Sequence, residues 1–203
     1  MKKVRNFLVL FLMVFCVLLV GSLVLQKQQI RDNIIRLHVV ADSDSEEDQT
    51  VKLLVRDAVT EEVSAALAQI PDKDQAMEYL SGHLAQLETV ANRVLLEQGF
   101  SQRAKVTLEA EAFSTRQYDT FALPAGVYDA LRVTIGSGQG KNWWCVVFPG
   151  LCMPEVGEDF ADQAAGAGFS EDLIGTLEQR QGYEVRFFLL DCLGWLENFF
   201  FRK

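Results

Sequence analysis

The chain has 203 residues and is acidic, with 28 Asp and Glu residues against 19 Lys and Arg residues and a net charge of −9. This charge argues against nucleic acid as a partner, because contact with a phosphate backbone requires a surplus of basic side chains. Without its N-terminal leader the chain keeps about 175 residues, which suits one domain with a sizeable core rather than two.

Residues 1–25 predict a signal peptide or an N-terminal membrane anchor. Three basic residues precede an apolar run from Phe7 to Leu25, which is the pattern of an export signal. Val20 and Ser22 suit the positions that a signal peptidase reads, yet the run is also close to the roughly 20 residues that cross a bilayer as a helix. Both alternatives stay open, and both place residues 30–203 outside the cytoplasm as one predicted domain.

The next segments predict one strand and two long helices. Ile34–Val40 is rich in β-branched residues and runs into an acidic turn, as a short strand would. Apolar residues then recur at steps of three and four over Ser45–Gln69 and over Asp72–Gln98, which predicts two amphipathic helices. Pro71 ends the first helix and Gly99 follows the second.

Three strand-like runs follow the helices, and Gly and Pro residues separate them. They read AKVTLEAEAF, YDALRVTIG and NWWCVVF. Because both long helices precede most of the strands, the sequence predicts an α+β fold rather than a regularly wound α/β sheet. We expect the two helices to lie antiparallel to each other and to pack on a mostly antiparallel sheet.

The last third of the chain is less regular. The acidic, glycine-rich stretch 154–168 predicts a mobile loop, and Ser170 predicts the start of a short helix. The aromatic tail from Tyr183 to Lys203 fits either a strand followed by a helix or one amphipathic helix. Its aromatic side chains are expected to be core rather than a surface for a membrane or a partner.

The glycine-rich turn GSGQGK, residues 136–141, resembles a phosphate-binding loop only superficially. It is one residue shorter than a P-loop, Asn142 stands where Ser or Thr is required, and a strand-like run follows instead of a helix. We interpret it as a flexible hairpin connection whose glycines allow positive φ. No nucleotide or other cofactor is expected.

Three cysteines follow the leader. Cys145 and Cys152 are the predicted disulfide, because Pro and Gly between them favour a chain reversal, although two buried free thiols remain the alternative. Cys192 lies among apolar residues and is expected in the core. A rival hypothesis makes Cys145 the nucleophile of an exported hydrolase or cell-wall amidase, with His38 as its base across the sheet.

No metal site is expected from the sequence. The acidic run Asp42–Asp48 alternates like the start of a calcium loop, but Glu47 stands at the position of the required Gly and Leu53 at that of the required Glu. The histidines and cysteines show no zinc spacing. The acidic side chains fit a turn and a helix N-terminus instead.

Recognition of another protein is the function that remains. Trp143 and Trp144 are adjacent, so on a strand they point to opposite faces of the sheet, and one of them can anchor a partner. Without the three leader cations the net charge is about −12, which weakens any attraction to an anionic bilayer and favours a protein partner.

Two long motifs and the apolar leader closely resemble the stage II sporulation protein R family of endospore-forming bacteria. The motifs are IIRLHVVADSDSEEDQTVKLLVRDAV and LPAGVYDALRVTIGSGQGKNWWCVVFPGLC. The resemblance covers about Ile34 to Cys152 and implies a signalling protein rather than an enzyme. It implies export across the forespore membrane into the space between the two sporulating compartments. There the protein would activate the membrane-embedded sigma-E-factor-processing peptidase, which removes the pro-sequence of pro-sigma-E.

We expect the folded domain to bind the extracytoplasmic face of that protease and to stabilise its active arrangement. The alternative for some of the charged residues is that they pair along the sheet and helix. The candidate partner-binding residues are Arg36, His38, Asp42, Ser43, Asp44, Arg56, Arg132, Lys141, Asn142, Trp143 and Trp144.

Overall fold

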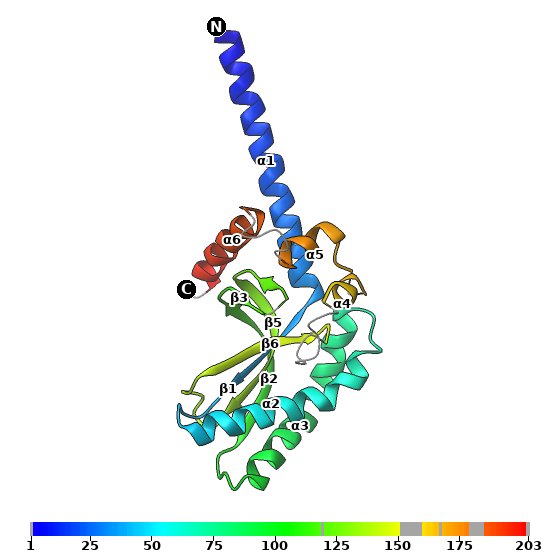
Figure 1. Ribbon diagram of the computed structural model, residues 1–203, viewed down its shortest axis with the longest axis vertical. Helices are drawn as coiled ribbons and strands as arrows, with labels where there is room; N and C mark the ends of the chain where they lie inside the picture. Colours follow the sequence, from blue (N-terminus) through cyan, green and yellow to red (C-terminus); the bar gives the residue numbers. More distant parts are fainter. Residues whose placement is uncertain (1, 119, 151–159, 167, 179–184, 202–203) are drawn as a thin grey trace.

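A four-stranded sheet forms the centre of the fold, in the order β2-β5-β1-β6 (Figure 1). The computed structural model describes residues 2–118, 120–150, 160–166, 168–178 and 185–201. Strand β1 (Ile35–Val40) is parallel to β5 (Gly126–Ile135) and antiparallel to β6 (Asn142–Phe148). Strand β2 (Ala104–Phe113) pairs antiparallel with β5. The predicted α+β fold is confirmed, and its sheet is mixed because the first strand inserts between β5 and β6.

Two long helices cover one face of the sheet, as the sequence predicts. Helix α2 (Glu46–Leu67) is capped by Ser45, whose side chain accepts the amide of Asp48 at 3.1 Å. Helix α3 (Lys73–Glu97) is capped by Asp72 in the same way. Such caps satisfy amides that the first turn leaves without a helical partner. The larger core lies between these helices and the sheet, and its fully buried members include Leu37, Val55, Leu80, Ala91 and Leu131.

The other face of the sheet is covered over one half only. A second core forms there between the strands, the end of helix α1 (Lys2–Asn33) and the C-terminal helices. These helices are α4 (Phe160–Gly166), α5 (Glu171–Glu178) and α6 (Val185–Phe201), with the short strands β3 (Arg116–Gln117) and β4 (Ala122–Leu123) beside them. No helix of the described part of the chain covers the remaining half of this face (Figure 1).

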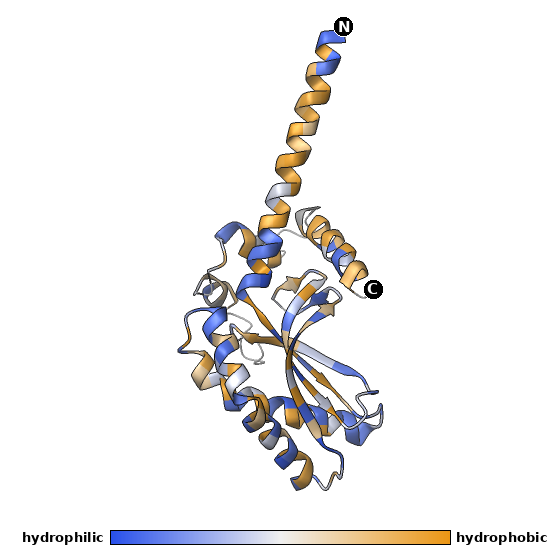
Figure 2. Cartoon of the chain, turned by 180° about the vertical axis from the view of Figure 1, so that it is seen from behind, coloured by the Kyte–Doolittle hydropathy of each residue, from blue (hydrophilic) through white to orange (hydrophobic). Residues whose placement is uncertain are grey.

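Helix α1 carries the apolar leader away from the rest of the molecule (Figures 1 and 2). Most of its apolar side chains are exposed, for example Phe7 and Leu18, each 67% exposed. The helix is long and apolar enough to cross a membrane, and its position at the N-terminus fits a signal sequence equally. Only its last turns, with Ile30 buried, pack on the domain.

The glycine-rich turn 136–141 is not a hairpin. It joins β5 to β6, which are not neighbours, and therefore crosses the end of β1. Gly136 and Gly138 adopt the expected positive φ. The turn is held against the β1–α2 connection, since the Gly140 amide donates to Ala41 at 2.9 Å and a Cβ at Gly140 would lie 2.2 Å from a backbone oxygen. Flexibility is therefore the wrong description of this turn.

Three expectations for the last third are also wrong. Residues 160–166 of the predicted loop 154–168 form α4, because Phe160 and Ala164 pack into the second core. The loop residues 154–159 and 167 lie outside the described part of the chain. The described tail is one helix, α6, and most of its aromatic side chains are exposed rather than core. Cys192 is exposed as well.

Candidate functional site

Strand alternation sends every second residue of the sheet to the face opposite α2 and α3. Where no helix covers that face, five side chains from four strands gather, and we name them the polar sheet cluster. Its members are His38, Glu111, Arg132, Asn142 and Trp144. The register explains the gathering, because His38 of the central strand β1 lies opposite Arg132 of β5 on one side and Trp144 of β6 on the other.

His38 is the centre of the polar sheet cluster. Its Nδ1 lies 2.6 Å from Glu111 Oε2 and its Nε2 lies 2.9 Å from Asn142 Oδ1. Both neighbours present oxygen, so a doubly protonated ring satisfies both, whereas a singly protonated ring requires the Asn142 amide to turn. Both ring nitrogens of His38 are thus engaged by side chains of the same chain.

Glu111 carries the compensating negative charge. Burial favours the neutral acid, but the hydrogen bond and charge of His38, with those of Arg132, outweigh it and hold the pKa of Glu111 below its ordinary value. Arg132 Nη1 donates to Glu111 Oε1 at 3.0 Å. The cluster is thus a fixed set of charges on the sheet rather than a group of mobile surface side chains.

Trp144 adds an aromatic surface to the cluster. Its ring stacks on His38 with 5.6 Å between the centroids, and the Arg116 guanidinium lies 3.5 Å from the Trp144 centroid. The side chain is half-buried. A flat ring held between an imidazole and a guanidinium is a suitable anchor for a partner, because its position is fixed before binding.

Trp143 points to the opposite face, as strand alternation predicts. Its side chain is 36% exposed, and the Arg56 guanidinium lies 4.3 Å from its ring centroid. Arg56 also bonds its neighbour Asp57 at 2.7 Å. Trp143 and Trp144 therefore project from the two faces of β6, one of the two outer strands of the described sheet.

The acidic turn after β1 has a structural role in the described contacts. Asp42 accepts the Ser137 amide at 2.5 Å, and this backbone bond is the main reason why the pKa of Asp42 is lowered. Asp44 accepts the Lys141 amide at 2.7 Å, and Ser43 donates to Asp48. Three of the candidate residues thus hold the glycine-rich turn against the start of α2, and Lys141 keeps its exposed side chain beside Asn142.

Two sequence-based interpretations are corrected by the burial and the register. Arg36 does not lie on the surface: it is fully buried, donates to Tyr118 at 2.9 Å and packs over the Phe113 ring. Cys145 and His38 cannot form a catalytic pair. Cys145 lies opposite Leu37 in the core under α2 and α3, whereas His38 belongs to the other face of the sheet.

Cysteine pairing stays a prediction. Within the described part of the chain the free cysteines are Cys16 and Cys192, and Cys145 is not among them. Its predicted partner Cys152 lies outside the described residues. Among the residues that the structure does describe, no group of three or more His, Cys, Asp or Glu side chains is placed to hold a metal ion.

Sequence reasoning missed Glu111 and Arg116. The alternation of β2 carried a signal for Glu111, because Glu109 and Glu111 occupy the face opposite Val106 and therefore require solvent or a cationic partner. Arg116 offered no signal, since its position over Trp144 depends on a short strand that pairs with β4 rather than with the main sheet.

Comparison with known proteins agrees with the motifs in β1, β5 and β6. The family model described as stage II sporulation protein R matches residues 31–158. The chain is 31% identical to stage II sporulation protein R of Bacillus subtilis (strain 168), over 84% of this chain and 83% of that protein. No solved structure matches significantly. The matched residues contain the whole sheet and its helical layer, and the chain belongs to the stage II sporulation protein R family.

Proposed function

We propose that this chain is an exported signalling protein that activates the sigma-E-factor-processing peptidase by non-covalent binding to its extracytoplasmic face. The family membership supports the role in sporulation. The apolar helix α1 supports delivery across the forespore membrane, as a cleaved signal or as an anchor. The intermembrane space would then be the place where the domain acts.

The observation that carries the proposal is the start of β6, an outer strand of the described sheet, where Asn142, Trp143 and Trp144 present one amide and two rings. Cation contacts fix both rings, and His38 binds Asn142. A surface that is fixed before binding loses little conformational freedom when a partner docks. Lys141 and Arg132 add positive charge on a domain that is otherwise acidic.

Activation requires only that the protease bind this surface better in its active arrangement than in its inactive one. The test is co-expression of the full chain with the protease and pro-sigma-E in cells that lack other sporulation proteins. Processing of pro-sigma-E should depend on this chain. Asn142→Ala and Trp143→Ala should each reduce processing by about tenfold, the loss expected when a contact of about 1.4 kcal/mol disappears.

Leu96→Ala is the matched control, because Leu96 is 77% exposed on α3, away from the described contacts of β6. It should leave processing unchanged. Full processing with Asn142→Ala and Trp143→Ala, in chains that are exported and folded, would show that this surface is not the binding site. Processing that does not need the chain at all would refute the function itself.

A further inference from the structure

Helix α6 turns most of its aromatic side chains outward, whereas its two acidic side chains, Asp191 and Glu197, bind partners in the rest of the molecule. Trp195 is 67% exposed and Phe200 65% exposed, and Leu196 and Phe199 are exposed with them. Phe199 follows Trp195 by four residues and Leu196 by three, and Phe200 follows Leu196 by four, so these side chains share one face of the helix. Among the described side chains of residues 187–201, this outward face carries no charge. A surface helix in water normally presents the opposite arrangement.

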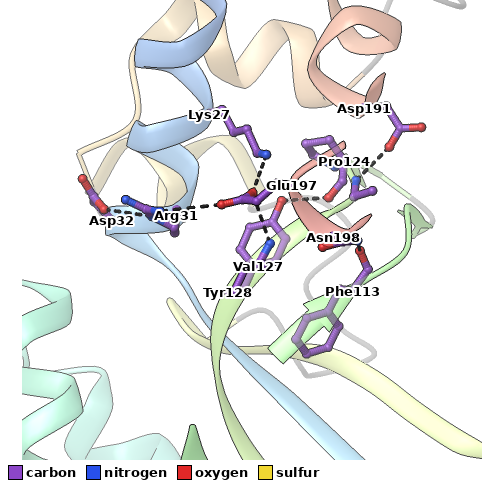
Figure 3. A network of polar contacts seen from close by, with 11 residues as sticks. Lys27, Arg31, Asp32, Phe113, Pro124, Val127, Tyr128, Asp191, Glu197 and Asn198 are labelled. Carbon is purple, nitrogen blue, oxygen red and sulfur yellow. Dashed lines mark hydrogen bonds and ion pairs between the residues drawn. The ribbon is translucent and has the colours of Figure 1, made fainter. Parts of the chain in front are cut away.

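The inward acids are held by partners from two other parts of the molecule (Figure 3). Glu197 forms ion pairs with Lys27 and with Arg31 of α1, the latter at 3.8 Å, and also receives the Val127 amide at 3.4 Å. Asp191 accepts the Ala125 amide at 2.7 Å.

Two further contacts lock the rotation of α6. Asn198 donates to the Phe113 backbone oxygen at 2.7 Å. Gly194 faces the Ala125 carbonyl so closely that a Cβ there would lie 1.5 Å from the oxygen. The aromatic face is therefore held outward by specific contacts on the opposite side of the helix.

The position of α6 indicates what covers this face. Its partners Lys27 and Arg31 come just after the apolar run of α1 ends at Leu25. With a rise of about 1.5 Å per residue, they lie only about 3 and 9 Å along the axis beyond that end. An interfacial helix buries its apolar face within about 5–10 Å of the boundary between headgroups and acyl chains. Helix α6 thus lies beside α1 at the level where α1 would leave the hydrocarbon (Figures 1 and 2).

We infer that α6 is an interfacial membrane helix whose Trp195 and Phe200 face enters the outer layer of the bilayer that α1 enters. Trp, Phe and Leu are typical of the apolar face of such helices. Insertion here is driven by apolar area and not by charge, because the exported part of the chain is acidic. The two helices together would hold the sheet with the glycine-rich turn pointing away from the bilayer (Figure 1).

The test uses the full chain reconstituted in phosphatidylcholine vesicles that carry bromine on the acyl chains, which quenches nearby Trp fluorescence. The chain has three Trp residues, so Trp143→Phe with Trp144→Phe leaves Trp195 as the reporter. Its emission should fall by about half relative to vesicles without bromine. The matched control replaces Trp195 by Phe in that background and adds Leu96→Trp on α3, whose emission should not fall.

A second measurement keeps the native tryptophans. With Cys16→Ser, a nitroxide on the exposed Cys192 of α6 should be more accessible to oxygen dissolved in lipid than to a water-soluble nickel complex. Equal quenching of Trp195 and of the Leu96→Trp control would overturn the inference. A Cys192 label that is more accessible to the nickel complex than to oxygen would overturn it too. So would a label that neither reagent reaches, the result expected if a second copy or another protein covers this face.

Discussion

Helices α3 and α6 both lie on the surface of the domain and both bury apolar residues against it, yet they turn different kinds of residue outward. Helix α3 buries Leu80 and Leu87 on the sheet and turns mainly polar residues outward. Helix α6 buries Phe187 and Leu190 and still turns Trp195 outward. The difference lies in the acids: those of α3 are mostly exposed, whereas Asp191 and Glu197 of α6 have partners inside the molecule. A periodic pattern therefore does not decide which face meets water.

The largest expected effect is on the free energy of unfolding, and it compares a buried residue of α3 with an outward residue of α6. Leu80→Ala should lower the free energy of unfolding by about 2–5 kcal/mol, because Leu80 is fully buried in the larger core and leaves a cavity. Leu196→Ala, at a position 48% exposed on α6, should change it by less than about 0.5 kcal/mol. Denaturant unfolding of both variants measures this, and equal losses would contradict the comparison.

The next contrast is between Gly194 of α6, which is closely packed, and Gly82 of α3, which is not. Gly194→Ala should displace α6, because the added Cβ would lie 1.5 Å from the Ala125 oxygen. Gly82→Ala meets no atom within 4 Å and should stabilise α3 by about 0.5–1 kcal/mol through helix propensity. Limited proteolysis should cut α6 faster in Gly194→Ala only. Unchanged protection of α6 in that variant would refute its close packing.

Glu111, the acid of the polar sheet cluster, predicts a smaller effect on stability that depends on pH. The folded pKa of Glu111 is below its ordinary value of about 4.3. Its stabilising contribution is therefore complete above that ordinary value and is lost as the pH falls through the folded pKa. Glu111→Gln should cost about 1 kcal/mol near neutral pH and should remove this part of the acid sensitivity. Urea unfolding from pH 7 to 3 tests it.

Glu109→Gln is the control for that measurement, because Glu109 is an exposed carboxylate two residues away on the same face. It should leave the pH profile unchanged. If Glu109→Gln and Glu111→Gln alter the profile equally, the His38 and Arg132 contacts do not bind the ionised carboxylate preferentially.

The smallest effect leaves stability unchanged and concerns thiol exposure. In Cys16→Ser, a maleimide should label the native chain at the exposed Cys192 and not at Cys145, which is 4% exposed in the larger core. Mass spectrometry of the labelled protein measures both sites. Labelling of Cys145 after unfolding without a reductant would refute the predicted bridge to Cys152, whereas protection of Cys145 would support it.

Local patterns were sufficient for much of the fold. The steps of three and four predicted α2 and α3 to within two residues at each end, and strand alternation predicted that Trp143 and Trp144 face opposite ways. The site was harder to predict from the sequence, because its central contact joins His38 to Glu111, which is 73 residues away in the chain. The turn 136–141 was misread for a related reason, since only the insertion of β1 between β5 and β6 turns a hairpin into a crossover.

The sequence by itself determined the apolar leader, the two long helices, the strands and the family, because each rests on residues that are close together in the chain. The tertiary structure alone decided that Arg36 is buried, that His38 and Cys145 are separated by the sheet, and that α6 faces outward with its rings. Those outcomes depend on which distant segments supply partners. Glu197, for example, lies against the domain because it forms an ion pair with Lys27, which is 170 residues earlier in the chain.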